Sequence, residues 1–487
     1  MIGKQAEAAH RRRVSKRMIA LITTVFYLAG FIAAGHAVLT TRTAPGAIAW
    51  SVSLVSMPFV AVPAYLVFGR SKFQGGVAAY EAGQDEIDER VREIRSGLEA
   101  WTYPGPERPG VYEALKALSG FGMVRGNRTE LLVNGEPTFE SILAGIARAE
   151  EYVLLQFYMI HDDQTGRRVK DALIERARAG VRVYVLYDEI GSSGLPRQYV
   201  ADLEDAGAEV SSFKPTQGAG NRFQLNFRNH RKIVVVDGVS AWVGGHNVGD
   251  EYLGMDPDFS PWRDTHVRID GPAALQLQAV VFGDWYWATR ELLDLTWEAT
   301  PADGGDIPIM IVPSAPSQRL ETAGLLFTTA LHSARERIWI SAPYFVPDEA
   351  VMKALELAAL RGVDVRIITT GKPDSLPVYL AAFHYMSQLR DLGIRFYAYT
   401  PGFLHEKVTL IDEEWSTVGT ANFDNRSFRL NFEVTAIIAD TAFASEMEAM
   451  FEADFAHSVE IDPTAIDEKP LYWRLGVALS RLASPVL

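Results

Sequence analysis

The stretch "HRKIVVVDG" (residues 230–238) decides the fold because it recurs as "HEKVTLID" (405–412), with His-x-Lys, four residues and an Asp in both copies. Its run of apolar residues predicts a buried β-strand, and charged residues at the ends of a single strand would be ordinary. The repeat continues past each strand to a glycine and an asparagine at matching offsets, Gly244 and Asn247, then Gly419 and Asn422. We infer an internal duplication.

The duplication extends upstream of both histidine motifs. Residues 142–160 resemble 326–345, and residues 169–188 resemble 352–371; each segment reads as a helix followed by an apolar strand. This alternation predicts an α/β fold of two pseudo-symmetric units, each with a sheet flanked by helices. Two such units could bring the histidine strands together at one interface.

Bulk composition narrows the functional classes. The chain has 487 residues, enough for two sizeable cores, and its lack of cysteine excludes disulfides, thiolate catalysis and cysteine-ligated zinc. Its net charge of −14 counts against a nucleic-acid partner, whose phosphates would meet an acidic surface. The sequence has no His-Glu-x-x-His motif, Walker loop or Rossmann glycine pattern, so we expect neither a metal nor a nucleotide cofactor.

The N-terminal region is strongly apolar. Residues 18–39 carry no charged side chain and could cross a bilayer as one helix. A second such run, 44–68, is interrupted by Pro58 and Pro63, which membrane helices tolerate. A secretory signal peptide would explain the first run alone, but the second run favours an uncleaved two-helix transmembrane hairpin.

The charges around these runs predict an orientation. Basic residues precede the first run and follow the second: Lys4, Arg11, Arg12, Arg13, Lys16, Arg17, then Arg70 and Lys72. The positive-inside rule places both flanks in the cytoplasm. We therefore expect a multi-pass membrane protein whose N-terminus and two α/β units are cytoplasmic.

These patterns divide the chain into four segments. We expect a basic tail and transmembrane hairpin over residues 1–72, a juxtamembrane connector over 73–130, a first α/β unit over 131–300 and a second over 301–487. The last segment ends in an amphipathic helix within "LYWRLGVALSRLASPVL" (471–487), which lies in the membrane interface or packs against the second unit.

The duplicated polar residues suit one chemical task, the handling of a phosphodiester. Lys232 and Lys407 could bind the charged phosphoryl oxygens, with Asn247 and Asn422 donating neutral hydrogen bonds. One imidazole could attack phosphorus to give a phosphohistidine, while the other protonates the leaving alkoxide and later activates the incoming alcohol or water. His230 and His405 are the candidates for these two roles.

Four carboxylates accompany the histidines. Asp264 and Glu433 stand in the strands that follow the two motifs, where each could orient an imidazole through its far nitrogen. Asp237 and Asp412 belong to the catalytic motif by sequence. Strand alternation puts them on the face opposite His and Lys, so we expect them to anchor the strands through hydrogen bonds or ion pairs.

Two His-x-Lys-x4-Asp motifs, each followed by Gly-x-x-Asn, resemble the phospholipase D superfamily. "NFRNHRKIVVVDGVSAWVGGHNVGDEY" (226–252), "APYFVPD" (342–348) and "GTANFDNRSFRLNFEV" (419–434) resemble bacterial cardiolipin synthases more narrowly, over essentially the whole chain. Thr420 stands where that family often has serine, which keeps the hydroxyl. The resemblance implies two phospholipase D-like units in a protein of the bacterial cell membrane.

The resemblance also implies the reaction. A cardiolipin synthase of this type transfers a phosphatidyl group between two phosphatidylglycerols of the bilayer and releases glycerol, with no nucleotide-activated donor. By analogy His230 is the nucleophile and His405 the acid and base, although the two halves are nearly symmetric in chemistry.

Three alternatives stay open at this point. A membrane-bound phospholipase D hydrolase, or a transphosphatidylase with another alcohol as acceptor, would use the same residues. A nuclease of the superfamily fits poorly with the apolar N-terminus and the acidic charge. A non-catalytic membrane scaffold would not need both motifs, and the sequence determines neither the acceptor nor the oligomeric state.

Overall fold

The computed structural model describes residues 2–69, 84–105, 109–216, 226–462, 464 and 468–487. The chain forms two compact units. The smaller comprises Met1–Gly75 with Pro215–Phe227, and the larger comprises Gly76–Lys214 with Arg228–Leu487. Both histidine motifs belong to the larger unit.

The smaller unit contains three apolar helices, α1 (Ile2–Thr40), α2 (Ala44–Ser56) and α3 (Pro58–Phe68). Among the described residues, Ser15–Thr40 of α1 is the one stretch that is long and apolar enough to cross a membrane, by length and composition. The second predicted span forms two short helices instead of one. Met57, with φ −135° and ψ 54°, leaves the helical region because a residue before proline avoids it.

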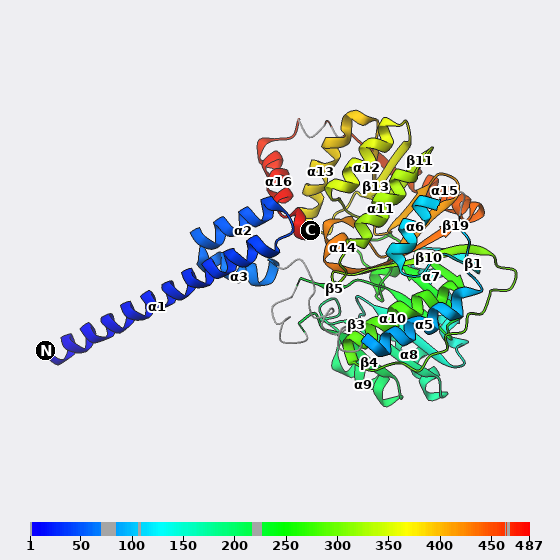
Figure 1. Cartoon of the computed structure of the whole chain (residues 1–487), viewed down its shortest axis with the longest axis horizontal. Coiled ribbons are helices and arrows are strands. Elements are labelled where there is room, and N and C mark those ends of the chain that lie inside the picture. The colour runs from blue at the N-terminus through cyan, green and yellow to red at the C-terminus, as the bar shows by residue number, and fades with distance from the viewer. Residues whose placement is uncertain (1, 70–83, 106–108, 217–225, 463, 465–467) are drawn as a thin grey trace. The chain divides into compact units, whose positions relative to one another are not determined.

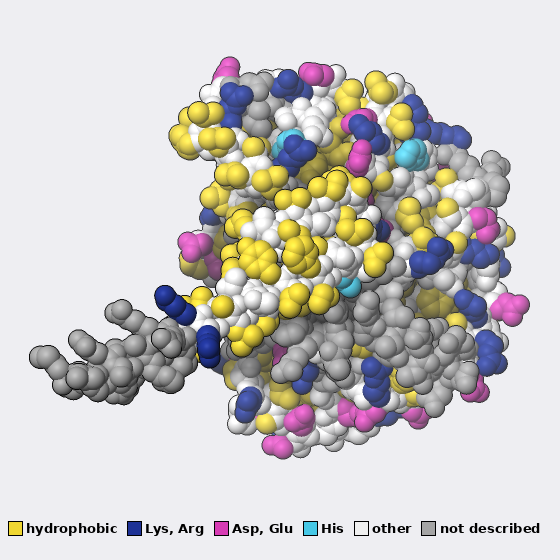
Figure 2. All heavy atoms as spheres, turned by 60° about the vertical axis from the view of Figure 1, so that its left-hand side comes forward, with side chains coloured by type: hydrophobic (Ala, Val, Ile, Leu, Met, Phe, Trp, Pro, Cys, Tyr) yellow, Lys and Arg dark blue, Asp and Glu magenta, His cyan; other side chains and the backbone are white. Residues whose placement is uncertain are grey.

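Close packing holds these helices against one another. A Cβ atom at Gly30 would lie 2.4 Å from the carbonyl oxygen of Leu54, so only glycine fits this approach of α1 to α2. Nδ1 of His36 lies 2.8 Å from the hydroxyl of Tyr65, which joins α1 to α3. Many other apolar side chains of α1 are exposed, and Figure 2 shows hydrophobic side chains gathered on the surface of the protein.

The larger unit is built on a 16-stranded sheet. Its N-terminal part comprises α5 (Gln84–Glu99) and α6 (Pro109–Ser119). The first half then follows with β1 (Val124–Val133), α7 (Gly135–Ala147), β2 (Tyr152–Phe157), α8 (Gln164–Arg178), β3 (Arg182–Asp188), α9 (Arg197–Asp205), β4 (Glu209–Phe213), β5 (Arg228–Asn229), β6 (Ile233–Val236), β7 (Ser240–Gly244), the 3-10 helix η2 (Asp250–Leu253), β8 (Trp262–Arg263), β9 (Thr265–Asp270) and α10 (Ala273–Thr289).

The second half repeats this series. It comprises β10 (Ile307–Ser314), α11 (Thr322–Ser333), β11 (Arg337–Ser341), β12 (Phe345–Val346), α12 (Glu349–Leu360), β13 (Asp364–Thr370), α13 (Leu376–Leu389), β14 (Arg395–Tyr399), β15 (Phe403–Leu404), β16 (Val408–Ile411), β17 (Trp415–Gly419), β18 (Phe423–Asp424), α14 (Asn425–Arg429), β19 (Asn431–Ala439), α15 (Thr441–Ala456), β20 (Ser458–Ile461) and α16 (Leu471–Leu482).

The order of strands confirms the predicted pseudo-symmetry. From the centre outward, the first half runs β1-β9-β7-β6-β2-β3-β4 and the second runs β10-β19-β17-β16-β11-β13-β14, with β20 added at its edge. Antiparallel pairing of β1 with β10 joins the two predicted sheets into one, so that neither half leaves this edge unpaired. Figure 1 shows helices flanking the strands of both halves.

The C-terminal helix α16 packs against α13. Val477 is buried, and the rings of Trp473 and Phe383 lie 5.0 Å apart at 72°. Gly476 lies close to Leu380 of α13. The opposite side of α16 is exposed, so packing on the second half involves only part of its surface.

Candidate active site

Each motif histidine is fixed to the backbone of the other half of the chain. The His230 amide donates to the carbonyl of Phe432 at 2.9 Å, next to the pairing of β5 with β19. The His405 amide donates to the carbonyl of Arg263 at 2.8 Å, next to the pairing of β15 with β8. These reciprocal contacts bring the two motifs into one site.

The imidazole side chains follow the same crossed arrangement. Nδ1 of His230 lies 3.0 Å from both carboxylate oxygens of Glu433, and Nδ1 of His405 lies 2.7 Å from Oδ2 of Asp264. Both carboxylate side chains are fully buried. Because a carboxylate can only accept, each neutral ring donates from Nδ1–H and keeps its lone pair on Nε2.

The two carboxylates are held as anions by different neighbours. Thr420 donates to Glu433 at 2.6 Å and Asn431 donates to it at 3.0 Å, whereas Asp264 accepts the Thr265 amide at 2.8 Å. Burial would raise the pKa of Glu433, but His230 and the neighbouring lysine outweigh burial and the pKa is lowered. Burial is likewise outweighed at Asp264, whose pKa is held far below its usual range by the histidines and lysine around it.

Both imidazoles are neutral at neutral pH. Burial lowers the pKa of His230 to about 4, against the opposing attraction of Glu433. Burial, together with Lys407, lowers the pKa of His405 to about 3, against the attraction of Asp264. A neutral imidazole has the lone pair that a nucleophile or general base requires.

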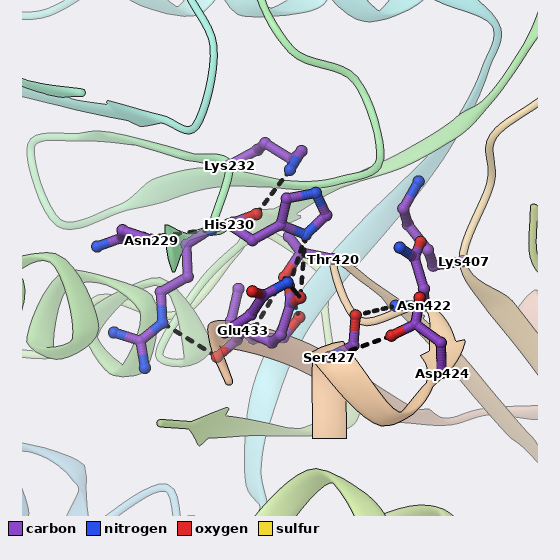
Figure 3. A network of polar contacts seen from close by, with 12 residues as sticks. Asn229, His230, Lys232, Lys407, Thr420, Asn422, Asp424, Ser427 and Glu433 are labelled. Atoms are coloured by element: carbon purple, nitrogen blue, oxygen red, sulfur yellow. Dashed lines mark hydrogen bonds and ion pairs between the residues drawn. The ribbon is translucent and has the colours of Figure 1, made fainter. Parts of the chain in front are cut away.

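Two buried lysines complete the centre. Nζ of Lys232 donates to the carbonyl of His230 at 2.6 Å, and Lys407 donates to the carbonyl of His405. Burial lowers the pKa of Lys232 to about 7 and that of Lys407 to about 8, although Glu433 and Asp264 oppose it. In Figure 3 the Lys232 amino group lies beside the His230 ring above Glu433, and the Lys407 side chain points upward on the right, beside Asn422. A phosphate anion bound near the two amino groups would offset their charge.

The two asparagines differ in their contacts. Asn247 donates to the Tyr252 hydroxyl at 2.7 Å and accepts the Met159 amide at 3.2 Å. Oδ1 of Asn422 is buried without a hydrogen-bond partner among the described residues, while its backbone amide is bound by Ser427. Asn422, which lies beside Lys407 in Figure 3, therefore has an acceptor oxygen left for a donor group of a ligand.

The motif aspartates lie at the far ends of their strands, where they bind backbone. Asp237 accepts the amides of Glu150, Glu151 and Tyr152, each at 2.8 Å. Asp412 accepts the amides of the corresponding residues of the second half, Arg335, Glu336 and Arg337. Both adopt φ of 52°, in the left-handed region. The aspartates therefore anchor strands, and the structure does not bring them to the imidazoles.

Sequence reasoning missed the residues between His and Lys. Arg231 donates to the Glu433 carbonyl at 3.0 Å and pairs with Asp284 at 2.6 Å. Glu406 pairs with Arg263 at 2.9 Å, and Arg263 also binds Asp454 through two hydrogen bonds. The contact of Arg231 with Glu433 and the pairs that Arg263 forms with Glu406 and Asp454 join the two halves, whereas the Arg231–Asp284 pair lies within the first half. Strand alternation could have shown that these side chains face away from the site.

The surroundings of the two imidazoles are unequal. The ring of His230 has Tyr158 at 5.1 Å, and Nζ of Lys232 lies 5.3 Å from the centre of that tyrosine ring. The ring of His405 has Trp262 at 5.2 Å and Phe403 at 5.8 Å. The second imidazole therefore has the more apolar neighbourhood.

One cluster among the described residues has the geometry of a metal site. The ligand atoms of His161, Asp163 and Glu251 lie within 4.8 Å of one another. Both oxygens of Asp163 already accept amides, from Gly166 and Asp250. Asp163 therefore caps the start of α8 and stabilises the loop at Asp250, and these structural roles account for the cluster.

Comparison with known proteins decides the family. A family model described as "Cardiolipin synthase, PLD-like domain" matches residues 142–280 and 327–455. Cardiolipin synthase A of Pseudomonas fluorescens strain Pf-5 is 48% identical over 96% of this chain and 98% of its own length. The chain belongs to the cardiolipin synthase family. Cardiolipin synthase A of Pseudomonas aeruginosa PAO1 is 45% identical over 98% of both chains.

The two matched stretches of the cardiolipin synthase family contain His230 with Asp264 and His405 with Glu433, respectively. The crystal structure of phosphatidylserine synthase from Haemophilus influenzae has a TM-score of 0.59 at 13% identity, covering 77% of this chain and all of that one. At that identity the likeness shows the fold alone, which agrees with the predicted phospholipase D-like architecture.

Proposed function

We propose that this chain is a cardiolipin synthase that transfers the phosphatidyl group of one phosphatidylglycerol to a second. The observation that carries the proposal is the crossed pair of imidazoles, each neutral, each held by a buried carboxylate of the other half, beside two buried lysines. This arrangement suits a phosphodiester because charge that develops on its oxygens meets Lys232 and Lys407 in a water-poor site.

In the first step Nε2 of His230 attacks phosphorus, and the bond from phosphorus to the glycerol oxygen breaks. His405, protonated once the phosphate anion is bound, gives its Nε2 proton to that oxygen, and free glycerol leaves. The product on the protein is a phosphatidyl group bonded to His230. Glu433 stabilises the positive charge that forms on the attacking ring.

In the second step a hydroxyl of the incoming phosphatidylglycerol attacks the phosphorus of this intermediate. His405, now neutral, takes the hydroxyl proton, and the bond from phosphorus to His230 breaks. Cardiolipin leaves, and both imidazoles return to their starting protonation. Asp264 supports the proton-carrying role of His405 because its charge favours the imidazolium form.

We further propose that the protein is held in the bacterial cell membrane with its catalytic unit on the cytoplasmic side. The apolar stretch Ser15–Thr40 supports one crossing, and the basic residues before it favour a cytoplasmic N-terminus. With a cytoplasmic N-terminus, a cytoplasmic catalytic unit requires the chain to cross the bilayer a second time after α1. Helices α2 and α3 would have to make this second crossing together, since each is shorter than the roughly 20 residues that a single span needs.

Product analysis tests this function. Purified full-length protein given phosphatidylglycerol in mixed micelles should yield cardiolipin and glycerol in equal amounts. Phosphatidic acid as the main product would instead identify a hydrolase, and a mixed diester formed with an added alcohol would identify a broader transphosphatidylase. His230→Ala and His405→Ala should abolish turnover; a wild-type protein that turns over no more lipid than these variants would indicate a non-catalytic scaffold.

A further inference from the structure

Helix α16 has two apolar sides, and only one of them is covered. Val477 and Trp473 face α13, as described above. The other side carries large apolar side chains that are 53–76% exposed: Leu471, Tyr472, Leu475, Leu479 and Leu482. We call these five residues the apolar stripe of α16.

The stripe has the geometry of a surface-binding helix. At about 100° per residue, its five members fall within an arc of roughly 100°, and Val477 lies on the opposite side of the helix. A helix that packed on the protein alone would have no reason to place four leucines and a tyrosine in water. The apolar stripe is therefore a surface for binding another molecule or a membrane.

The charges on α16 indicate what the apolar stripe binds. Helix α16 contains two basic side chains, Arg474 and Arg481, and no acidic one, although the whole chain has a net charge of −14. Arg474 and Arg481 are exposed and lie beside the stripe, where their stems could follow the apolar surface while the guanidinium groups reach anionic headgroups. A protein partner would not require this local excess of positive charge.

We propose that α16 lies on the surface of an anionic phospholipid bilayer, with its apolar stripe inserted among the acyl chains and its opposite side fixed to α13. The same chain carries the apolar stretch Ser15–Thr40, which is long and apolar enough to cross a bilayer. Because α16 is packed on the second catalytic half, this contact would fix how that half meets the membrane.

The absence of cysteine makes a direct test possible, since one introduced cysteine gives a uniquely labelled protein. Leu475→Cys and Leu479→Cys would be labelled with a small fluorophore in the full-length protein, reconstituted into vesicles of phosphatidylglycerol and phosphatidylethanolamine. The matched control is Leu360→Cys on α12, a leucine that is 71% exposed and outside the stripe. Quenching by nitroxide on lipid acyl chains would be compared with quenching by iodide in water.

The proposal predicts that labels at 475 and 479 are quenched by the lipid nitroxide and protected from iodide, with the reverse at 360. Equal iodide quenching at all three positions would overturn it, because the stripe would then face water. Protection from both quenchers at 475 and 479 would also overturn it, since protein would then cover the stripe. No catalysis enters this measurement, so its outcome is independent of the proposed reaction.

A second experiment tests the role of the two arginines of α16. Arg474→Gln with Arg481→Gln should reduce the lipid quenching of the label at 475 in these anionic vesicles. Unchanged quenching would remove the electrostatic part of the proposal.

Discussion

Nδ1 of His405 lies 2.7 Å from Oδ2 of Asp264, a residue 141 positions earlier and in the opposite half of the duplicated chain. The converse pair, His230 with Glu433, is separated by 203 positions. Neither half therefore contains a complete pair of imidazole and carboxylate. Duplication here does not give two active sites, because each imidazole depends on the other copy for its carboxylate.

Asp264→Asn tests this crossed pairing. Loss of the carboxylate removes an interaction that raises the pKa of His405, so the ring is protonated in a smaller fraction of molecules. It then less often carries the proton that the leaving glycerol needs. We expect kcat to fall by about 10³- to 10⁴-fold, as when a carboxylate that orients a catalytic imidazole is neutralised.

Histidine ¹⁵N spectra of the same variant, assigned with His230→Ala and His405→Ala, distinguish the two possible pairings. The His405 signal should shift and the His230 signal should stay in place. Glu433→Gln is the matched control and should shift His230 alone. A change at His230 in Asp264→Asn would contradict the crossed arrangement.

Asp237→Ala should reduce stability much more than chemistry. Three backbone amides lose their acceptor, at a position whose φ of 52° is strained for alanine. We expect the free energy of unfolding to fall by about 3 kcal/mol or more, with kcat per folded molecule within a few-fold of wild type. Thermal unfolding of the solubilised protein, with activity measured on the folded fraction, checks both.

Asp237→Asn should be milder, since asparagine keeps an oxygen acceptor and tolerates positive φ. Asp391→Ala, at a side chain that is 87% exposed, is the surface control. A variant Asp237→Ala that is fully stable but inactive would place this aspartate in the reaction itself.

The lysines predict the alkaline side of the pH profile. Burial lowers the pKa of Lys232 to about 7 and that of Lys407 to about 8, so raising the pH through this range removes protons from the two lysines of the free enzyme. The attraction for the phosphate falls with each proton lost. We therefore expect kcat/KM, which reports groups of the free enzyme, to decline above pH 7 to 8.

In contrast, kcat should decline at higher pH, because bound phosphate stabilises the charged lysines. Lys232→Arg keeps its charge throughout and should move the decline in kcat/KM to higher pH if the variant still turns over. A kcat/KM that is level from pH 6 to 9.5 would mean that protonated lysines do not control binding.

Much of this architecture could be predicted from the repeated motif. The duplication indicated two equivalent α/β halves, and the paired positions of Asp264 and Glu433 singled them out as partners for imidazoles. Spacing along the chain could not show that the partners are exchanged, because the exchange depends on pairing of β5 with β19 and of β15 with β8, far apart in sequence.

Other features depended on local detail that a hydropathy pattern hides. The run 44–68 is apolar throughout, but Pro58 removes Met57 from the helical region and gives two short helices in place of one span. Arg231 and Glu406 occupy the variable position between His and Lys of the motif, to which the sequence assigned no role. Their ion pairs with Asp284 and Arg263 could not be predicted, because the sequence does not show which residues lie on the buried side of these strands.

The central claim is that one imidazole carries the phosphatidyl group while the other moves the proton. Mass spectrometry of peptides after brief mixing with phosphatidylglycerol, with neutral quenching, measures this directly in wild type, His405→Ala and His230→Ala. The account predicts a phosphatidyl adduct on His230 in wild type, far less of it in His405→Ala, which lacks the acid for the leaving glycerol, and none in His230→Ala. An adduct on His405, or cardiolipin formed without any adduct on a histidine, would contradict it.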